Sequence, residues 1–97
     1  MQGKTAIITG GGSGFGREVA LKLAKKGVNI SVVDRSKENG EETVRLCKEL
    51  GCDAIFIQAD VSKVEDAKRY VAQTVGHFGK IDLFLTMQEF LVPESVL

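Results

Sequence analysis

Eight residues near the amino terminus are the segment of this chain best suited to chemistry. They read Thr-Gly-Gly-Gly-Ser-Gly-Phe-Gly at positions 9–16 and follow directly on the largely apolar run at 5–8. A buried strand that passes through a glycine-rich turn into a helix presents backbone N–H groups to a phosphate. Glycines there permit the sharp turn, the close approach of backbone to a pyrophosphate, and close packing of helix on strand. The segment predicts a dinucleotide-binding site, with a purely structural turn as the alternative.

An acidic residue follows at the place where such a site needs one. Asp34 ends the apolar segment 29–34, 18 residues after Gly16. A carboxylate there accepts hydrogen bonds from the adenosine ribose and repels the 2′-phosphate of NADP. Arg35 is a contrary sign, because its guanidinium could cover the adenine or meet a phosphate. We expect NAD as the cofactor, with NADP less favoured, and a solvated or helix-capping role for Asp34 stays open.

Other kinds of site are not indicated by the sequence. Residues 11–16 have the Walker spacing, but Arg-Glu follows where Lys-Ser/Thr is needed. Cys47 and Cys52 match neither a CxxC redox pair nor a zinc half-site, so we expect reduced packing residues and no metal site. The single histidine, His77, is expected in the last turn of a helix, where a cation interacts favourably with the helix dipole.

Four apolar segments alternate with three amphipathic ones, and these elements must position the glycine turn. Strands are predicted at 4–9, 29–34, 54–59 and 81–86, and helices at 15–26, 37–50 and between Ser62 and Gly79. The side chains expected to face the core are Val19, Ala20, Leu23 and Ala24 in the first helix, Val44, Cys47 and Leu50 in the second, and Val64, Ala67, Val71, Val75 and Phe78 in the third.

Two helix starts carry capping signals. Ser36 is expected to cap the second helix, and Ser62 with Glu65 is expected to form a capping box on the third. The resulting order predicts an α/β fold of the Rossmann type, β-α-β-α-β-α-β, with a parallel sheet of strand order 3-2-1-4. A ligand would bind above the carboxyl ends of the first and fourth strands. We expect residues 1–86 to form this partial domain and residues 87–97 a divergent hydrophobic tail.

The spacing GxxxGxG, preceded by Thr9, resembles the opening of the short-chain dehydrogenase/reductase family, and the resemblance covers residues 3–85. It implies that Ser13, Gly14, Phe15 and Gly16 line the pyrophosphate and that Thr9 braces the turn. It also implies that Asp60 holds the adenine amino group beside Val61, although Asp60 in the alternative only orders the turn before Ser62. The full set of expected cofactor-binding residues is Thr9, Gly10, Ser13, Gly14, Phe15, Gly16, Asp34, Arg35, Asp60 and Val61.

The family pattern breaks after residue 85. The family's Asn-Asn-Ala-Gly segment is expected at 86–89, where this chain has Thr-Met-Gln-Glu. The family's catalytic Ser and Tyr-x-x-x-Lys have no counterpart, because the single tyrosine, Tyr70, is followed four residues later by Thr74 and is expected to be a packing residue. We predict no catalytic residue. The expectation is the truncated, NAD(P)-binding portion of an oxidoreductase whose full-length relatives transfer a hydride between NAD and an alcohol or ketone.

Two other functions stay open: a non-catalytic nucleotide-binding or interaction module and, less favoured, a fragment of a SAM-dependent methyltransferase. The 13 basic residues balance the 13 acidic ones, which gives no signal for nucleic acid. No apolar run approaches the roughly 20 residues of a membrane span, so no membrane partner and a cytoplasmic location are expected. The fourth strand would expose its edge, a possible route to self-association unless the tail folds back over it.

Overall fold

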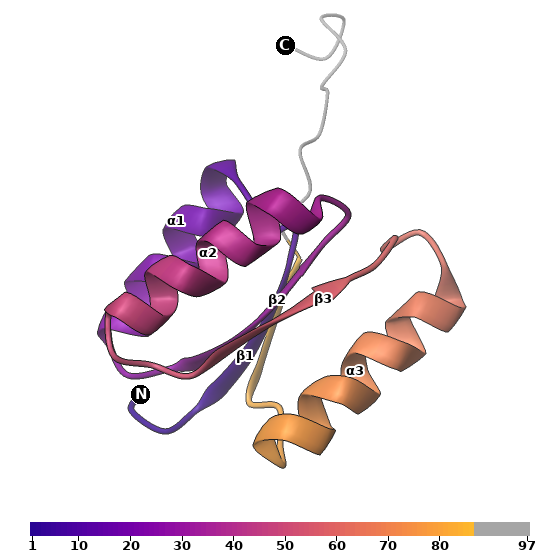
Figure 1. The fold of residues 1–97 in the computed structure, drawn as a ribbon. Helices are drawn as coiled ribbons and strands as arrows, with labels where there is room; N and C mark the ends of the chain where they lie inside the picture. Colours follow the sequence, from indigo (N-terminus) through magenta and orange to yellow (C-terminus); the bar gives the residue numbers. More distant parts are fainter. Residues whose placement is uncertain (87–97) are drawn as a thin grey trace, which may run out of the picture.

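The computed structural model of the chain describes residues 1–86 as four strands alternating with three helices (Figure 1). The predicted tail, residues 87–97, lies outside the described residues, and the division into domain and tail stays a prediction. The elements in chain order are β1 (Thr5–Thr9), α1 (Gly14–Lys25), β2 (Asn29–Asp34), α2 (Lys37–Glu49), β3 (Ala54–Gln58), α3 (Val64–Phe78) and β4 (Leu83–Thr86).

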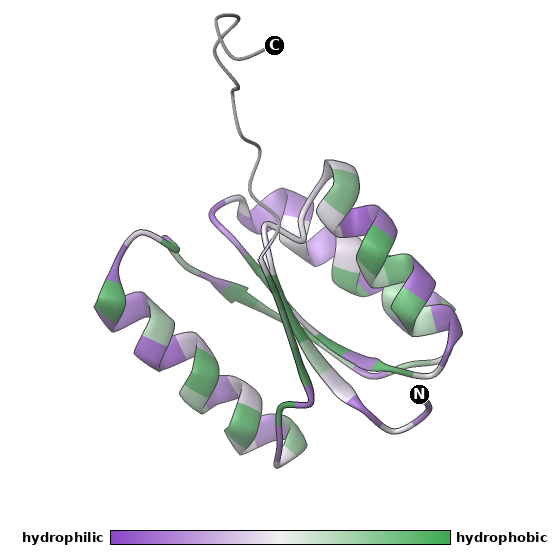
Figure 2. Ribbon diagram, turned by 180° about the vertical axis from the view of Figure 1, so that it is seen from behind, coloured by the Kyte–Doolittle hydropathy of each residue, from purple (hydrophilic) through white to green (hydrophobic). Residues whose placement is uncertain are grey.

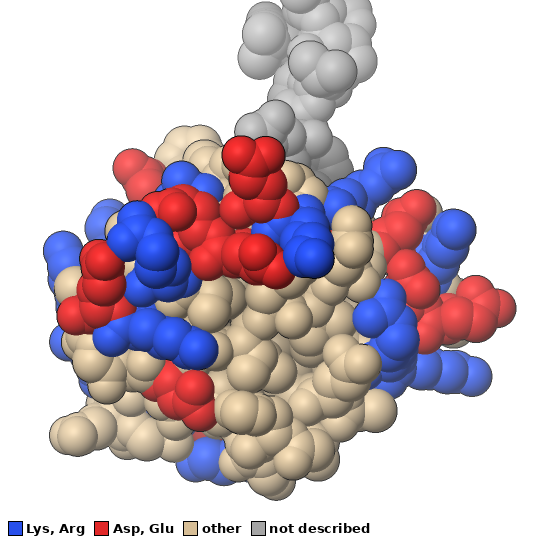
Figure 3. Space-filling model, in the orientation of Figure 1, with Lys and Arg blue, Asp and Glu red and all other residues tan. Residues whose placement is uncertain are grey.

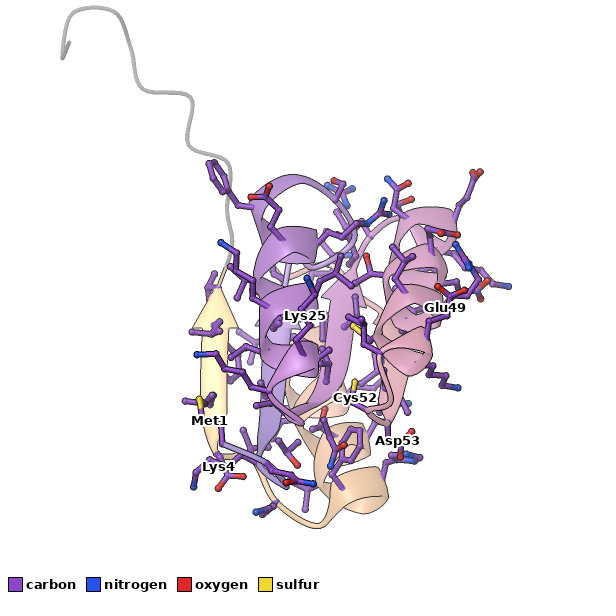
Figure 4. The ribbon with its side chains drawn as sticks, turned by 90° about the vertical axis from the view of Figure 1, so that its left-hand side faces the viewer. Met1, Lys4, Lys25, Glu49, Cys52 and Asp53 are labelled. Carbon is purple, nitrogen blue, oxygen red and sulfur yellow. The ribbon has the colours of Figure 1, made fainter. Side chains whose placement is uncertain are left out.

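The strands form one parallel sheet in the order β3-β2-β1-β4, which confirms the predicted topology. β1 lies opposite β2 from Thr5–Asn29 to Thr9–Val33, so the two strands end side by side. β4 continues the sheet on the other side of β1 and forms one of its edges (Figure 4). The glycine turn therefore begins at the carboxyl end of a central strand, with the ends of β2 and β4 next to it.

Helices cover both faces of this sheet, with α1 and α2 on one face and α3 on the other (Figure 1). Each face has its own core. The larger core joins β1 and β2 to α1 and α2, while the smaller one joins Ile7, Val33 and Ile57 to Tyr70 of α3. Every residue of β1 is buried, and the predominantly hydrophobic strands lie between helices along which hydrophobic and hydrophilic residues alternate (Figure 2). A sheet covered on two sides needs such strands, because both sets of alternate side chains are removed from water.

The two predicted helix caps had different outcomes. Ser36 is the N-cap of α2 and its Oγ accepts the Asn39 N–H at 3.2 Å, as expected. The capping box on α3 is wrong: the N-cap is Lys63, which makes no side-chain cap bond. Ser62 Oγ instead donates to Asp60 Oδ1 at 2.6 Å, so its hydroxyl is engaged before the helix begins.

The predicted inner face of α3 is partly wrong. Val64 and Val75 are 69% and 43% exposed, whereas Tyr70 and Thr74 are buried. Thr74 Oγ1 lies 2.7 Å from Ser31 Oγ of β2 and donates to the Tyr70 carbonyl at 2.7 Å. These partners satisfy the hydroxyl and so permit its burial. Because a hydrophobic periodicity counts threonine as polar, it predicted burial of a neighbouring face of α3 that includes Val64 and Val75.

Cys47 belongs to α2, and Cys52 lies between the end of α2 and the start of β3 (Figure 4). Both are free and buried, as predicted, and Cys52 Sγ donates to the Cys47 carbonyl at 3.4 Å. Burial raises the pKa of the Cys47 thiol to about 12, so it stays protonated at neutral pH. The inward position predicted for Leu50 is wrong: this residue is the C-cap, beyond the last helical residue Glu49, and its side chain is 40% exposed.

Candidate functional site

The glycine turn, residues 10–13, leaves β1 at the edge where β2 also ends. Gly10 and Gly14 have φ of +72° and +57°, a region that side chains other than glycine's disfavour. The Gly10 and Gly11 amides both donate to the Val33 carbonyl, at 2.7 and 3.3 Å. The turn is thus attached to the last residues of β2.

The first turn of α1 is open to an anion. Ser13 is its N-cap in extended conformation, makes no side-chain cap bond, and no acidic residue lies in the first helical turn. The other two helices start differently, with Glu38 in α2 and with Glu65 and Asp66 in α3. Because the first amides of a helix carry a partial positive charge and lack internal acceptors, the start of α1 suits a phosphate.

Close packing holds this helix against the turn. A Cβ on Gly16 would overlap the Gly10 carbonyl, so only glycine allows α1 to approach so closely. Ser13 and Gly14 are exposed, and Phe15 is 78% exposed. The sequence placed all four residues, 13–16, at the same turn, and the structure does the same.

Asp34 is held at the end of β2 by two backbone amides. Its Oδ2 accepts the Gly12 N–H at 2.9 Å and its Oδ1 accepts the Ser36 N–H at 2.9 Å. The carboxylate is half-buried, next to the glycine turn. Each oxygen keeps acceptor capacity beyond the one amide that it binds.

Arg17 is a residue of this site that sequence reasoning missed. Its Nη2 donates to the Gly12 carbonyl at 2.6 Å and to the Asn39 carbonyl at 3.1 Å, and its Nε donates to Thr43 Oγ1 at 2.9 Å. The guanidinium therefore ties the turn to α2. Only its position directly after the last glycine was visible in the sequence, and its partners 22 and 26 residues away gave no local signal.

Asp60 and Val61 follow β3, whose end lies beside the end of β2 through the Asp34–Gln58 pair. Asp60 Oδ1 accepts the Ser62 N–H at 3.0 Å as well as the Ser62 hydroxyl. These bonds lower the pKa of the Asp60 carboxyl, with a smaller effect of the positive charge of Arg35. Val61 is half-buried against the smaller core.

Two further predicted residues, Arg35 and Thr9, differ in how far they are exposed to solvent. Arg35 is exposed, and its carbonyl accepts the Gln58 side-chain amide at 3.1 Å. Thr9 is buried, and its hydroxyl lies 3.5 Å from the Leu85 carbonyl, so its side chain links β1 to β4. All ten predicted residues thus belong to the carboxyl edge of the sheet or to the segments that leave it.

The other candidates for chemistry lie elsewhere. Tyr70 is 5% exposed and its ring centroid lies 6.1 Å from that of Phe84, as a packing residue would. His77, in the last turn of α3, has its Nε2 2.9 Å from Asp53 Oδ2, which lies just before β3 at the amino ends of the strands.

Lys, Arg, Asp and Glu side chains of both signs are interspersed on the face of the molecule shown in Figure 3.

A parallel sheet of order 3-2-1-4, a glycine turn after its first strand and an acid at the end of its second define the dinucleotide-binding portion of a Rossmann fold. The family model described as short chain dehydrogenase matches residues 4–87. The chain therefore belongs to the short-chain dehydrogenase family and corresponds to the NAD(P)-binding portion of its members. The methyltransferase alternative is thereby set aside.

Individual relatives agree with this assignment. An uncharacterized oxidoreductase from Thermotoga maritima is 44% identical over 84 residues, which are 87% of this chain and 33% of that protein. The structure of levodione reductase superimposes with a TM-score of 0.83 at 37% identity, covering 87% of this chain and 33% of the reductase. NAD⁺-bound xylitol dehydrogenase gives 0.83 at 34% identity, covering 86% and 32%. The chain spans about a third of the length of these relatives.

Among residues 1–86, each helix is too short or too polar to cross a lipid bilayer.

Proposed function

We propose that this chain binds NAD through the turn after β1 and the ends of β2 and β3, and that it prefers NAD to NADP. The observation that carries the proposal is the Asp34 carboxylate, fixed by two amides beside a helix start that has no acidic residue of its own. The whole protein's reaction, by family, is hydride transfer between this cofactor and an alcohol or ketone. The nicotinamide ring supplies or accepts that hydride when it is bound.

The residues of the turn fit a pyrophosphate. Ser13, Gly14 and Phe15 are exposed at the first turn of α1, and no acidic side chain there would repel phosphate oxygens. The absence of a Cβ at Gly16 lets the helix start lie against the turn. Gly10 belongs to the same unit because its positive φ sets the direction in which the turn leaves β1.

The adenosine half is assigned to the neighbouring strand ends. Asp34 would accept the ribose hydroxyls with the acceptor capacity that its two amide bonds leave free. The bonds to Ser62 lower the pKa of the Asp60 carboxyl, and the carboxylate would accept the adenine amino group beside Val61. We place Arg35, exposed next to Asp34, over the adenine, and give Thr9 a supporting role through its contact with β4.

The preference for NAD follows from charge. A 2′-phosphate on the ribose would lie beside the Asp34 carboxylate, and two like charges at contact distance destabilise the complex. Residues 10–13 carry no basic side chain to compensate. The NAD⁺ in the related xylitol dehydrogenase structure supports the same cofactor here.

We further propose that this chain by itself binds the cofactor without turning over a substrate. Its single tyrosine is in the core, four residues before the equally buried Thr74, so it supplies neither an exposed hydroxyl for proton transfer nor a lysine partner.

Titration calorimetry with NAD tests the binding proposal. The unmodified chain is expected to bind NAD more tightly than NADP. Asp34→Ala is expected to lower NAD affinity roughly tenfold or more, because hydrogen bonds to a charged group contribute about 1.5–3 kcal/mol each. Asp53→Ala removes the same charge at the opposite edge of the sheet and is the control that should leave affinity unchanged. Equal NAD affinities of Asp34→Ala and the unmodified chain would remove Asp34 from the site.

A further inference from the structure

Gly12 and Asp34 are in direct contact across the glycine turn. The Gly12 N–H donates to Asp34 Oδ2 at 2.9 Å, and the Gly12 residue is buried. A Cβ built on Gly12 would lie 2.7 Å from Asp34 Oδ2 and 2.8 Å from Asp34 Cγ. These separations are shorter than van der Waals contact, so the position of the carboxylate depends on the absence of a side chain at residue 12.

The backbone of Gly12 does not itself require glycine. Its φ is not among the positive values of this turn, so an alanine would be conformationally allowed. The obstacles to a side chain are Asp34 and, at 3.1 Å, the Cβ of Asn39. The neighbouring Gly11 differs, because the nearest neighbours of a Cβ there would be the Ile8 carbonyl and Val32 Cγ1, both at 3.1 Å, rather than Asp34.

The carbonyl group of Gly12 is held by two hydrogen bonds, and these decide whether the turn or the Asp34 side chain would shift if residue 12 had a side chain. Its carbonyl accepts Arg17 Nη2 at 2.6 Å and the Thr43 hydroxyl at 3.3 Å. Thr43 is buried in α2, so the turn has little freedom to withdraw toward that helix. A methyl group at residue 12 would therefore displace the Asp34 side chain, which is only half-buried, rather than the turn.

We propose that Gly12 is a specificity-determining position that acts through Asp34. Its bare Cα lets the carboxylate lie against the turn, where it faces the ribose and excludes the 2′-phosphate. Gly12 is thus a positioning residue for cofactor choice, and Arg17 and Thr43 hold it in place. This inference rests on the NAD preference proposed above.

The test is a set of cofactor affinities measured by calorimetry on the 97-residue chain. Gly12→Ala is expected to lower the ratio of NADP to NAD dissociation constants about tenfold, since specificity is a difference of two affinities. Gly11→Ala is the matched control and should leave that ratio within about twofold, whatever it does to overall affinity. In an Asp34→Ala background, Gly12→Ala should no longer change the ratio.

The outcomes separate the two proposals. If the unmodified chain prefers NADP or binds neither nucleotide, the proposed function fails and this inference falls with it. If the chain prefers NAD, Asp34→Ala removes the preference and Gly12→Ala keeps it, only the inference is overturned. A change of ratio that is as large in the Asp34→Ala background also overturns it, because the effect then does not pass through the carboxylate.

A measurement that needs no substitution at Gly12 covers the case in which Gly12→Ala does not fold. In amide proton spectra, the Gly12 resonance should lie downfield at neutral pH and move upfield in Asp34→Ala. The Gly11 amide donates to the Val33 carbonyl and should move little. If the chemical shift of the Gly12 amide proton is the same in Asp34→Ala as in the unmodified chain, the Gly12–Asp34 hydrogen bond is not formed and the inference is wrong.

Discussion

At the scale of single residues, the space around the missing Cβ decides what each of two helical glycines contributes. Gly16 lies where α1 meets the Gly10 carbonyl, while Gly76 lies in α3 with nothing within 4 Å of its missing Cβ. Both are helical glycines, and neither has a positive φ. The same substitution should therefore have opposite effects at the two positions.

Gly16→Ala is expected to lower the free energy of unfolding by about 1–3 kcal/mol, because the added methyl group overpacks a backbone contact. Gly76→Ala is expected to raise it by up to about 1 kcal/mol, because alanine is the better helix former and has room. Urea denaturation of both variants measures the difference. Equal stability of the two variants would contradict the tight helix–turn packing seen at Gly16.

At the scale of elements, β4 is joined to β1 by its backbone pairing and also by the side chain of Asp82, the residue before β4. The Thr5 N–H donates to Asp82 Oδ2 at 2.8 Å, and the Asp82 N–H donates to the Thr5 carbonyl at 2.8 Å. Lys80 Nζ lies 3.2 Å from the same Asp82 oxygen. The bond from Thr5 lowers the pKa of the Asp82 carboxyl, with smaller contributions from Lys80 and Lys4.

This lowered pKa predicts a stability change with acid. A carboxyl whose pKa is lower when folded stabilises the fold above its unfolded pKa, about 3.9, and loses that contribution as the pH falls through the folded value. Asp82→Asn should therefore be less stable than the unmodified chain at pH 7, and the difference should shrink below about pH 4. Thermal unfolding across this range measures it. A difference that is independent of pH would show that the carboxylate does not contribute.

The helices at the site also differ in the charge at their starts. The first turn of α2 carries Glu38 and that of α3 carries Glu65 and Asp66, whereas the first turn of α1 has no acidic residue. An element whose first amides have no internal acceptor is stabilised by an external anion. This contrast between helices of one small fold is why we assign the phosphates to α1.

At the scale of the whole molecule, the sheet is covered unevenly. β1 and most of β2 are buried, whereas residues of β4 alternate between half-buried and exposed, and Phe84 is 49% exposed. Within residues 1–86, no strand pairs with the outer edge of β4. Unpaired backbone beside exposed apolar side chains is a surface that favours strand-to-strand association.

We therefore expect the 97-residue chain to self-associate through β4 at high concentration. Phe84→Ser should weaken this association, because it removes exposed apolar area, while Val64→Ser on the exposed side of α3 should not. Sedimentation equilibrium of the three proteins gives the comparison. A chain that stays monomeric at every concentration, or a Phe84→Ser variant that associates as before, would rule out this surface.

Sequence alone was enough to predict the element order, the glycine turn and the place of Asp34. The turn and Asp34 depend on local patterns, a GxxxGxG that follows one apolar run and an acid that ends the next, and the strand order was predicted from the alternation of apolar and amphipathic segments along the chain. Parallel pairing then brings the strand ends together, because each strand leaves the same edge of the sheet.

Tertiary structure alone decided which polar side chains are satisfied, and by which partners. Thr74 is buried because Ser31 lies opposite its hydroxyl, and Arg17 joins the turn to α2 because Thr43 and the Asn39 carbonyl face it. Such residues look solvent-exposed in a hydrophobic pattern, since the pattern records their polarity but not the distant partner that compensates for it. Burial of a polar group depends on that partner, and only the folded chain brings the two together.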